Sequence, residues 1–264
     1  MTDITVKRYA TPKGEIALRE AGGGAGKPLV FLHGLGGSSK SWGRQLEHFG
    51  QTRRTIAWDC PGYGESADFP GGKPTCHDFA KALLAALDQA GVGDFDLVGH
   101  SMGGAVAPWV ARLAPLRVGK LTLSATKVSF GADSPLGYEK RLAERRAMDD
   151  RTFGEARARG MVGAQSPAFQ AVAAIAGEIR LTGYQGAIAL LLQADNRAIL
   201  PTIAQPTLVI AGADDTIAPA EATQAVKDAV PGARLTTIAA AAHAAYLQQP
   251  AHYNAVLEDF LASD

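Results

Sequence analysis

One serine lies between glycines at a point where a predicted strand gives way to a helical pattern. The stretch is Gly99-His100-Ser101-Met102-Gly103, and it directly follows the sequence DFDLV. A sharp strand-to-helix turn exposes a serine hydroxyl above a sheet, and glycines two residues away on either side leave room for that turn. The hydroxyl becomes a good nucleophile only when a neighbouring base takes its proton. Ser101 is therefore a candidate catalytic nucleophile, with an ordinary tight turn as the alternative.

The base is expected to be a histidine near the end of the chain. In a strand-turn-helix arrangement of this kind, the catalytic residues follow one another as serine, acid and histidine. Of the six histidines, His243 and His252 follow a suitable acid. His243 falls in the loop after the last predicted strand, from which its ring can reach over the sheet edge, whereas His252 falls in the first turn of a predicted final helix. We predict that His243 is the base, and the alternative is a histidine that only fills an alanine-rich loop.

Two adjacent carboxylates, Asp214 and Asp215, are candidates for the acid that orients the histidine. They follow the apolar run PTLVIAGA, and active sites of open α/β sheets gather at the carboxyl ends of the strands. Adjacent side chains point in different directions, so only one of them is expected to face the histidine. We predict Asp215 for this role and a turn or helix-capping role for Asp214. Residues 124–126, the other place where an acid would fit, contain no carboxylate.

Two backbone amides are predicted to form an oxyanion hole. A tetrahedral intermediate carries negative charge on oxygen and needs preorganised N–H donors. The N–H of Met102 lies next to the nucleophile, and a second donor is expected in the loop HGLGG after the run PLVFL. Glycines surround Leu35 in that loop and leave its backbone unhindered. We predict Leu35 and Met102 as the donors, with a merely flexible glycine turn as the alternative for the loop.

Alternating strands and helices are expected to position these residues. Strands are predicted at residues 4–10, 14–21, 28–34, 54–60, 94–100, 119–126, 206–215 and 233–240. Helices are predicted at residues 38–49, 75–90, 219–230 and 250–261, and from about residue 102 onward. The first two strands read as a hairpin, and Pro108 is expected to kink its helix or remove a hydrogen bond. The pattern predicts an α/β fold with a doubly wound, mostly parallel sheet.

A segment without a convincing strand interrupts this alternation. We predict a core domain formed by residues 1–127 and 201–264, with residues 128–200 as an inserted helical lid. The alternative is a helical excursion that only packs on the surface. An arginine of this segment could bind a substrate carboxylate through two hydrogen bonds, whereas the acidic neighbours favour a solvated, salt-bridged helix face. The arginines in question are Arg141, Arg145, Arg146, Arg151, Arg157, Arg159 and Arg180.

Composition excludes several classes of protein. The 264 residues include 26 lysines and arginines and 26 acids, so neither nucleic acid nor a membrane surface is an expected partner. No apolar run reaches the roughly 18 residues of a membrane-spanning helix, and no secretory signal is visible. Cys60 and Cys76 lack the spacing of a metal site. We expect a cytoplasmic protein with no metal and no cofactor, and leave its oligomeric state open.

Five motifs resemble those of the α/β-hydrolase family in order and spacing, over essentially the whole chain. They are FLHGLGG, WDCPGYGES, VGHSMGG, PTLVIAGADDTIAP and AAHAAYLQQPAHYNAVLEDFL. The resemblance implies that Ser101 is the nucleophile, Asp215 the acid and His243 the base. A serine at the nucleophile position argues against the epoxide-hydrolase and haloalkane-dehalogenase branches. Residues 183–215 resemble the corresponding region of 3-oxoadipate enol-lactonases and related small esterases.

Three functions are compatible with these residues. The first is hydrolysis of a small carboxylic ester or enol-lactone through an acyl-enzyme on Ser101, so that a small-molecule ester or lactone is the expected partner. The second is hydrolysis of a C–C bond in ring-fission products by the same triad. The third is a ligand receptor that keeps the fold and the triad without turnover.

Overall fold

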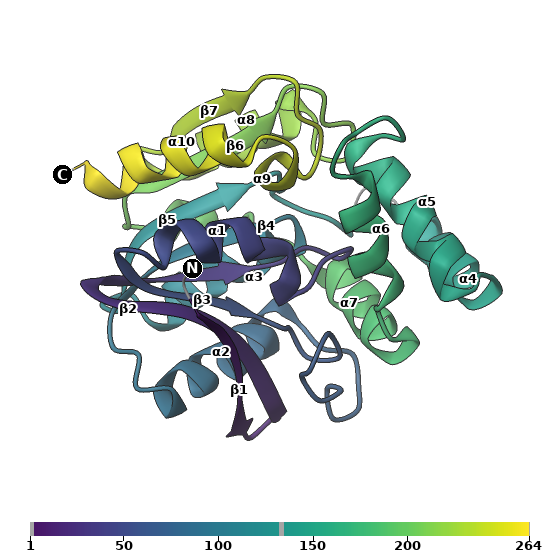
Figure 1. Cartoon of the computed structure of the whole chain (residues 1–264), viewed down its shortest axis with the longest axis horizontal. Helices are drawn as coiled ribbons and strands as arrows, with labels where there is room; N and C mark the ends of the chain where they lie inside the picture. The colour runs from purple at the N-terminus through teal and green to yellow at the C-terminus, as the bar shows by residue number, and fades with distance from the viewer. Residues whose placement is uncertain (1–2, 132–134, 264) are drawn as a thin grey trace.

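A seven-stranded sheet forms the centre of the computed structural model, which describes residues 3–131 and 135–263 (Figure 1). The strands are β1 (Ile4–Thr11), β2 (Gly14–Leu32), β3 (Arg53–Trp58), β4 (Phe95–His100), β5 (Val118–Ser124), β6 (Thr207–Gly212) and β7 (Arg234–Ile238). Their order is β1-β2-β4-β5-β6-β7, with β3 paired to β2. The pairs from β2 through β4, β5 and β6 to β7 are all parallel. The predicted mostly parallel α/β sheet is confirmed.

The N-terminal part of the sheet is more continuous than the sequence pattern indicated. β1 and β2 form the predicted antiparallel hairpin, but the strands expected at residues 14–21 and 28–34 run together as β2. Both halves of β2 contact β3, because Thr55 pairs with Ala21 and also with Leu29. The glycines between the two halves allow this close approach: a Cβ on Gly24 would lie 2.2 Å from the carbonyl oxygen of Thr52.

Helices cover both faces of the sheet. Those outside the long insertion are α1 (Gly43–Phe49), α2 (Cys76–Gln89), α3 (Met102–Leu113), α8 (Ala220–Ala229), α9 (Ala245–Gln248) and α10 (Pro250–Ala262). Successive residues of a strand face opposite sides of a sheet. Accordingly, Val30 and Leu32 belong to a core cluster with α2 and α3, whereas Leu29 and Phe31 belong to a cluster with α1 and α10. The near-continuous apolar runs of the sequence are thus explained by burial on both faces.

Among the described residues, four α-helices and a short 3-10 helix (Leu200–Thr202) separate β5 from β6. The α-helices are α4 (Pro135–Ala147), α5 (Asp150–Val162), α6 (Phe169–Gly177) and α7 (Leu181–Gln193). α5 packs on α6, and α7 packs on α4 and α3. Figure 1 shows the group, in teal to green, gathered at one side of the sheet, away from the C-terminus. Residues 132–134 of the predicted lid lie outside the described residues. The division of the chain into a core domain and a lid at residues 128–200 remains a prediction.

α3 continues through Pro108 without interruption. Proline has no N–H, so the hydrogen bond that this residue would donate within the helix is lost. Asn196 supports the same helix from outside, because its Nδ2 donates to the carbonyl oxygen of Ala105 at 3.0 Å and its Oδ1 accepts from the Trp109 ring.

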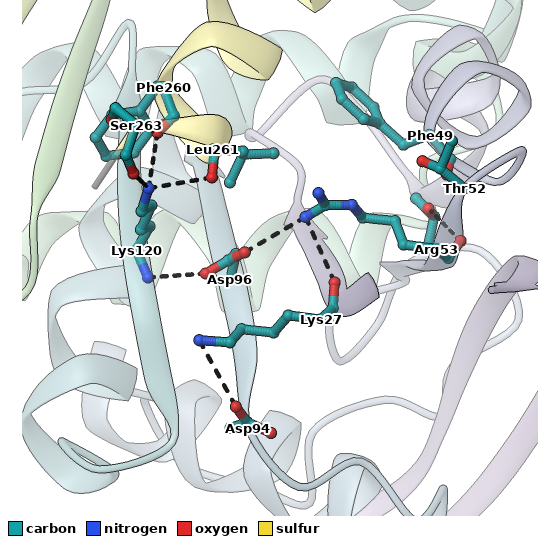
Figure 2. A network of polar contacts seen from close by, with 11 residues as sticks. Lys27, Phe49, Thr52, Arg53, Asp94, Asp96, Lys120, Phe260, Leu261 and Ser263 are labelled. Atoms are coloured by element: carbon teal, nitrogen blue, oxygen red, sulfur yellow. Dashed lines mark hydrogen bonds and ion pairs between the residues drawn. The ribbon is translucent and has the colours of Figure 1, made fainter. Parts of the chain in front are cut away.

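A polar network fastens the C-terminal helix at the amino ends of β4 and β5 (Figure 2). Asp96 accepts a hydrogen bond from the backbone N–H of Lys120 at 2.9 Å and another from Arg53 at 3.5 Å. The Lys120 ammonium donates to the carbonyl oxygens of Phe260 and Leu261, and also to that of Ser263. These carbonyls lie at the C-terminus of α10, where a cation interacts favourably with the helix dipole. In the part of the chain that the structure describes, none of the helices combines the length and apolarity needed to cross a membrane.

Candidate active site

Ser101 lies in a strained turn between β4 and α3. Its backbone has φ 52° and ψ −113°, a conformation that residues other than glycine rarely adopt. Holding a residue in this conformation costs about 1–3 kcal/mol. Two hydrogen bonds hold the turn. The Ser101 N–H donates to the carbonyl oxygen of Ser124 at 2.9 Å, and the Thr126 hydroxyl donates to the Ser101 carbonyl oxygen at 3.0 Å.

The glycines beside the turn are needed for clearance. A Cβ on Gly99 would lie 2.5 Å from the carbonyl oxygen of Gly103, and a Cβ on Gly103 would lie 2.4 Å from that of Leu32. Neither glycine has a positive φ. This turn, the nucleophile elbow, therefore requires glycine at both positions because other backbone atoms approach closely. The strained backbone conformation is that of Ser101 itself.

Asp215 and His243 form a buried pair at the carboxyl end of β6. The His243 Nδ1 donates to the Asp215 Oδ2 at 2.9 Å, and their side chains are 5% and 0% exposed, respectively. The other carboxylate oxygen accepts from the backbone N–H groups of Ile217 at 2.7 Å and Ala218 at 2.9 Å. Burial raises the pKa of Asp215, but the His243 hydrogen bond and charge and the two amides outweigh it, so that the pKa lies below its ordinary value.

This geometry distinguishes Asp215 and His243 from the alternative residues in the sequence. Asp214 and His252 are both exposed to solvent. No hydrogen bond or ion pair joins either side chain to Ser101 or His243 in residues 3–131 and 135–263. The structure thus brings together the pair that the sequence predicted, although its catalytic role remains a prediction.

Ser101 and His243 line one cavity of about 230 Å³, together with Leu35, Phe130 and Ile217. Within the described residues, no hydrogen bond joins the Ser101 hydroxyl to the His243 ring. Catalytic hydrogen bonds are often long without substrate and tighten only in the complex. The missing hydrogen bond is therefore compatible with the predicted pairing of two residues that line one cavity.

The side chain of His100 contacts the backbone of His243, and the sequence analysis did not predict this contact. The His100 Nε2 donates to the His243 carbonyl oxygen at 2.9 Å, and the two rings lie 4.8 Å apart. Complete burial, followed by the proximity of His243, lowers the pKa of His100 to about 3, so the ring is neutral at pH 7. The two histidines are 143 positions apart in sequence, and no local pattern indicated their contact.

The two predicted oxyanion donors lie in the loop after β2 and at the start of α3. Leu35 lines the cavity, and its N–H has no acceptor in the described residues. Met102 is the first residue of α3, where backbone N–H groups have no intrahelical acceptor. The loop of Leu35 is held by the Tyr63 hydroxyl, which donates to the Leu35 carbonyl oxygen at 3.1 Å. Tyr63 is a second supporting residue that the sequence did not reveal.

His33, at the start of the glycine loop, has a fixed tautomer. Its Nδ1 lies 2.9 Å from the Gly34 carbonyl oxygen and donates to it, while its Nε2 accepts from the Cys60 N–H at 3.1 Å. Burial lowers the pKa of His33, which keeps the ring neutral. His33 therefore positions the loop and does not face the cavity. In the described ranges, no group of three or more histidine, cysteine or acidic side chains could hold a metal ion.

Comparisons with known proteins agree with this fold. Residues 27–250 match the family model described as alpha/beta hydrolase fold. The chain is 30% identical over 257 residues to the 2-hydroxymuconate semialdehyde hydrolase of Pseudomonas putida, covering 90% of this chain and 88% of that one. It is 28% identical over 251 residues to a putative carbamate hydrolase, RutD, of Klebsiella pneumoniae, covering 90% and 92%.

Two solved structures are similar over nearly the whole chain. A hydrolase from Pseudomonas aeruginosa has a TM-score of 0.87 at 28% identity, covering 98% of this chain and 99% of that one. The enol-lactonase of Burkholderia xenovorans has a TM-score of 0.88 at 23% identity, covering 97% and 100%.

Some relatives are longer proteins. The chain spans 50% of the biotin biosynthesis bifunctional protein BioHC of Teredinibacter turnerae, at 27% identity over 291 residues that cover 99% of this chain. The family match over residues 27–250, together with the relative that is 30% identical over 90% of this chain, shows that the chain belongs to the α/β-hydrolase fold family.

Proposed function

We propose that the chain is a serine hydrolase that cleaves a small carboxylic ester or enol-lactone through an acyl-enzyme on Ser101. The observation that carries this proposal is the buried Asp215–His243 pair, at 2.9 Å, beside the cavity that Ser101 also lines. The strained elbow adds support, because a costly backbone conformation persists where the surrounding structure over-determines it and is common at active sites. The structural likeness to an enol-lactonase concerns the fold alone.

In the acylation step, the Ser101 Oγ attacks the carbonyl carbon while the His243 Nε2 takes the hydroxyl proton. Asp215 holds the ring through Nδ1 and stabilises the positive charge that forms on it. The N–H groups of Leu35 and Met102 donate to the oxyanion. When the tetrahedral intermediate collapses, the C–O bond to the leaving group breaks and His243 returns its proton to that group.

In the deacylation step, a water molecule replaces the alcohol. His243 takes a proton from the water, and the resulting hydroxide attacks the acyl carbon. Collapse of the second intermediate breaks the bond to the Ser101 Oγ, which recovers the proton, and releases the carboxylic acid. The cycle needs no cofactor, and in our proposal the substrate is the only small-molecule partner and the cytoplasm is the location.

Hydrolysis of a C–C bond by the same triad is the second candidate. The 30% identity to a 2-hydroxymuconate semialdehyde hydrolase favours it. The two reactions differ in the leaving group, an alkoxide or enolate oxygen in the first case and a carbon in the second. A non-catalytic receptor is a third outcome that the experiment can reveal.

The test is a substrate panel scored by kcat/KM for the wild type and Ser101→Ala. The panel contains short p-nitrophenyl esters, enol-lactones and ring-fission dienoates. We expect the wild type to prefer esters or enol-lactones and Ser101→Ala to lose about 10⁶-fold in kcat. A preference for the dienoates would support the C–C hydrolase, and the absence of any turnover would support the receptor. Unchanged ester hydrolysis by Ser101→Ala would refute the nucleophile assignment.

A further inference from the structure

The cavity above Ser101 has a positively charged lining. Three cationic side chains line it, those of Lys127, Arg141 and Arg157. No aspartate or glutamate lies among the described residues that line it. A concave site with charges of one sign raises the local concentration of ligands of the opposite sign. The lining therefore favours an anionic ligand beside the candidate nucleophile.

Arg157, on α5, differs from other arginines of the inserted helices. Its Nε is buried and has no hydrogen-bond partner. No ion pair joins its guanidinium to another residue in the described ranges. By contrast, Arg145 contacts Asp150 at 2.7 Å, and Arg180 contacts Asp68 at 3.0 Å. The Arg145 Nε is also buried without a partner, but Arg145 is ion-paired through Nη2 and does not line the cavity. Arg157 combines a place in the cavity lining with a buried donor, which is costly unless a ligand satisfies it.

The position of Arg157 places this donor near the predicted oxyanion loop. A Cβ on Gly36 would lie 3.8 Å from the Arg157 Nε and only 2.5 Å from the Met161 Sδ. α5 therefore packs directly on the loop residue that follows Leu35. The absence of a side chain at Gly36 leaves the room that the arginine and the methionine occupy. Arg157 and Leu35 consequently line the same small cavity.

We propose that Arg157 binds a free carboxylate of the substrate, so that the enzyme acts on short esters or lactones that carry a second, ionised carboxyl group. The planar guanidinium matches a carboxylate through two parallel hydrogen bonds, which a lysine cannot provide. Lys127 and Arg141 add positive charge to the same cavity. The volume of about 230 Å³ lies below the roughly 300–1,000 Å³ of drug-sized pockets, which favours a short substrate.

Two esters of equal chain length test the assignment. Mono-p-nitrophenyl glutarate carries a carboxylate where p-nitrophenyl pentanoate carries a methyl group. We expect the wild type to have the higher kcat/KM on the glutarate ester. In Arg157→Gln the ratio of the two kcat/KM values should fall about 10- to 100-fold, the effect of losing hydrogen bonds to a charged group, and Arg157→Lys should keep part of the preference. An unchanged ratio in Arg157→Gln would overturn the proposal.

Arg159→Gln is the matched control, because Arg159 lies on the same helix with its side chain exposed. It should leave the ratio at the wild-type value. A loss of preference equal to that of Arg157→Gln would mean that the general charge of α5, not a specific contact, selects the substrate.

Since this assignment rests on the proposed function, a binding experiment separates the two. Calorimetry with glutarate itself needs no turnover. We expect the dissociation constant to rise about 10- to 100-fold in Arg157→Gln even if neither ester is hydrolysed by the wild type. Failure of hydrolysis with intact Arg157-dependent glutarate binding would refute the proposed ester hydrolysis alone. Equal glutarate binding by the wild type and Arg157→Gln would refute the carboxylate site alone.

Discussion

Asp215 and Asp96 are two buried aspartates with opposite properties. As whole residues both are 5% exposed, and their side chains are 0% and 7% exposed. Asp215 lies at the carboxyl end of the parallel strands and Asp96 at the amino end. The pKa of Asp215 lies below its ordinary value, whereas burial raises the pKa of Asp96 above it despite the Lys120 amide and nearby cations. Burial alone therefore does not determine the charge of a carboxyl group.

The hydrogen-bond partners explain the difference. Asp215 accepts from a histidine ring at 2.9 Å and from two backbone amides at 2.7 and 2.9 Å. Asp96 accepts from one amide at 2.9 Å and from Arg53 at a longer 3.5 Å. Three short hydrogen bonds favour the charged form enough to outweigh desolvation, whereas the weaker set does not. The Asp215 carboxylate is suited to orienting a base. The Asp96 carboxyl group links β4 to β5 through the Lys120 amide.

The largest expected effect is on activity at Asp215. Asp215→Asn should lower kcat about 10⁴-fold, because the amide no longer stabilises the imidazolium or its correct tautomer. Asp96→Asn and Asp214→Asn should each stay within about threefold of the wild type, since neither contacts His243. The measurement is steady-state hydrolysis of p-nitrophenyl acetate. A loss at Asp96 comparable to that at Asp215 would remove the functional distinction between the two ends of the sheet.

The next effect concerns the support of His243. His100→Phe keeps a ring of similar size but removes the donor to the His243 carbonyl oxygen, which is left buried and unsatisfied. Such a loss costs about 1–3 kcal/mol, and we expect kcat to fall about 10- to 100-fold with little change in KM. A raised KM at unchanged kcat would show that His100 contacts the substrate instead of positioning the base.

At the other end of the sheet, the expected effect is on stability. Lys120→Met removes the ammonium that binds the last carbonyls of α10 and should lower the free energy of unfolding by about 1–2 kcal/mol, with kcat/KM unchanged. Urea denaturation gives the comparison with Lys81→Met, a control at an exposed position of α2. Equal destabilisation by the two substitutions would mean that the network in Figure 2 does not anchor the C-terminal helix.

The smallest effect is a pH dependence at Asp96. A carboxyl group whose pKa is raised in the folded state contributes stability at low pH, and this contribution is lost as the pH rises through the folded value. Asp96→Asn, which cannot ionise, should therefore gain in melting temperature relative to the wild type between pH 4 and pH 7. Asp215 has a lowered pKa, so its contribution is present above the ordinary pKa and is lost on acidification. Asp215→Asn should accordingly lose stability relative to the wild type as the pH rises toward the ordinary aspartate pKa of 3.8, with little further change above it.

The sheet and the Asp215–His243 contact could be predicted because local sequence patterns indicate them. Apolar runs predicted the strands. The position of two aspartates at a strand end, together with a late histidine, predicted the contact between Asp215 and His243, which are 2.9 Å apart in the structure. The continuity of β2 was not predicted, because a glycine-rich stretch is typical of a turn between strands. In this structure the glycines instead allow β2 to approach the backbone of Thr52 closely.

Contacts between distant segments were not predictable. Nothing near His100 indicated that its ring would donate to the backbone of His243, and nothing near Tyr63 indicated its bond to the Leu35 carbonyl oxygen. The sequence likewise did not single out Arg157 among the arginines of residues 128–200. Only the packing of α5 on Gly36 shows which guanidinium has a buried donor facing the site.

The central claim is that Ser101 forms a covalent intermediate. Its most direct test is labelling of the wild type with a p-nitrophenyl phosphonate, followed by digestion and peptide mass spectrometry. We predict one phosphonyl group per chain, on the Ser101 Oγ, with labelling abolished in Ser101→Ala and strongly slowed in Asp215→Asn. A label on another residue, or an unlabelled wild-type protein, would contradict the account.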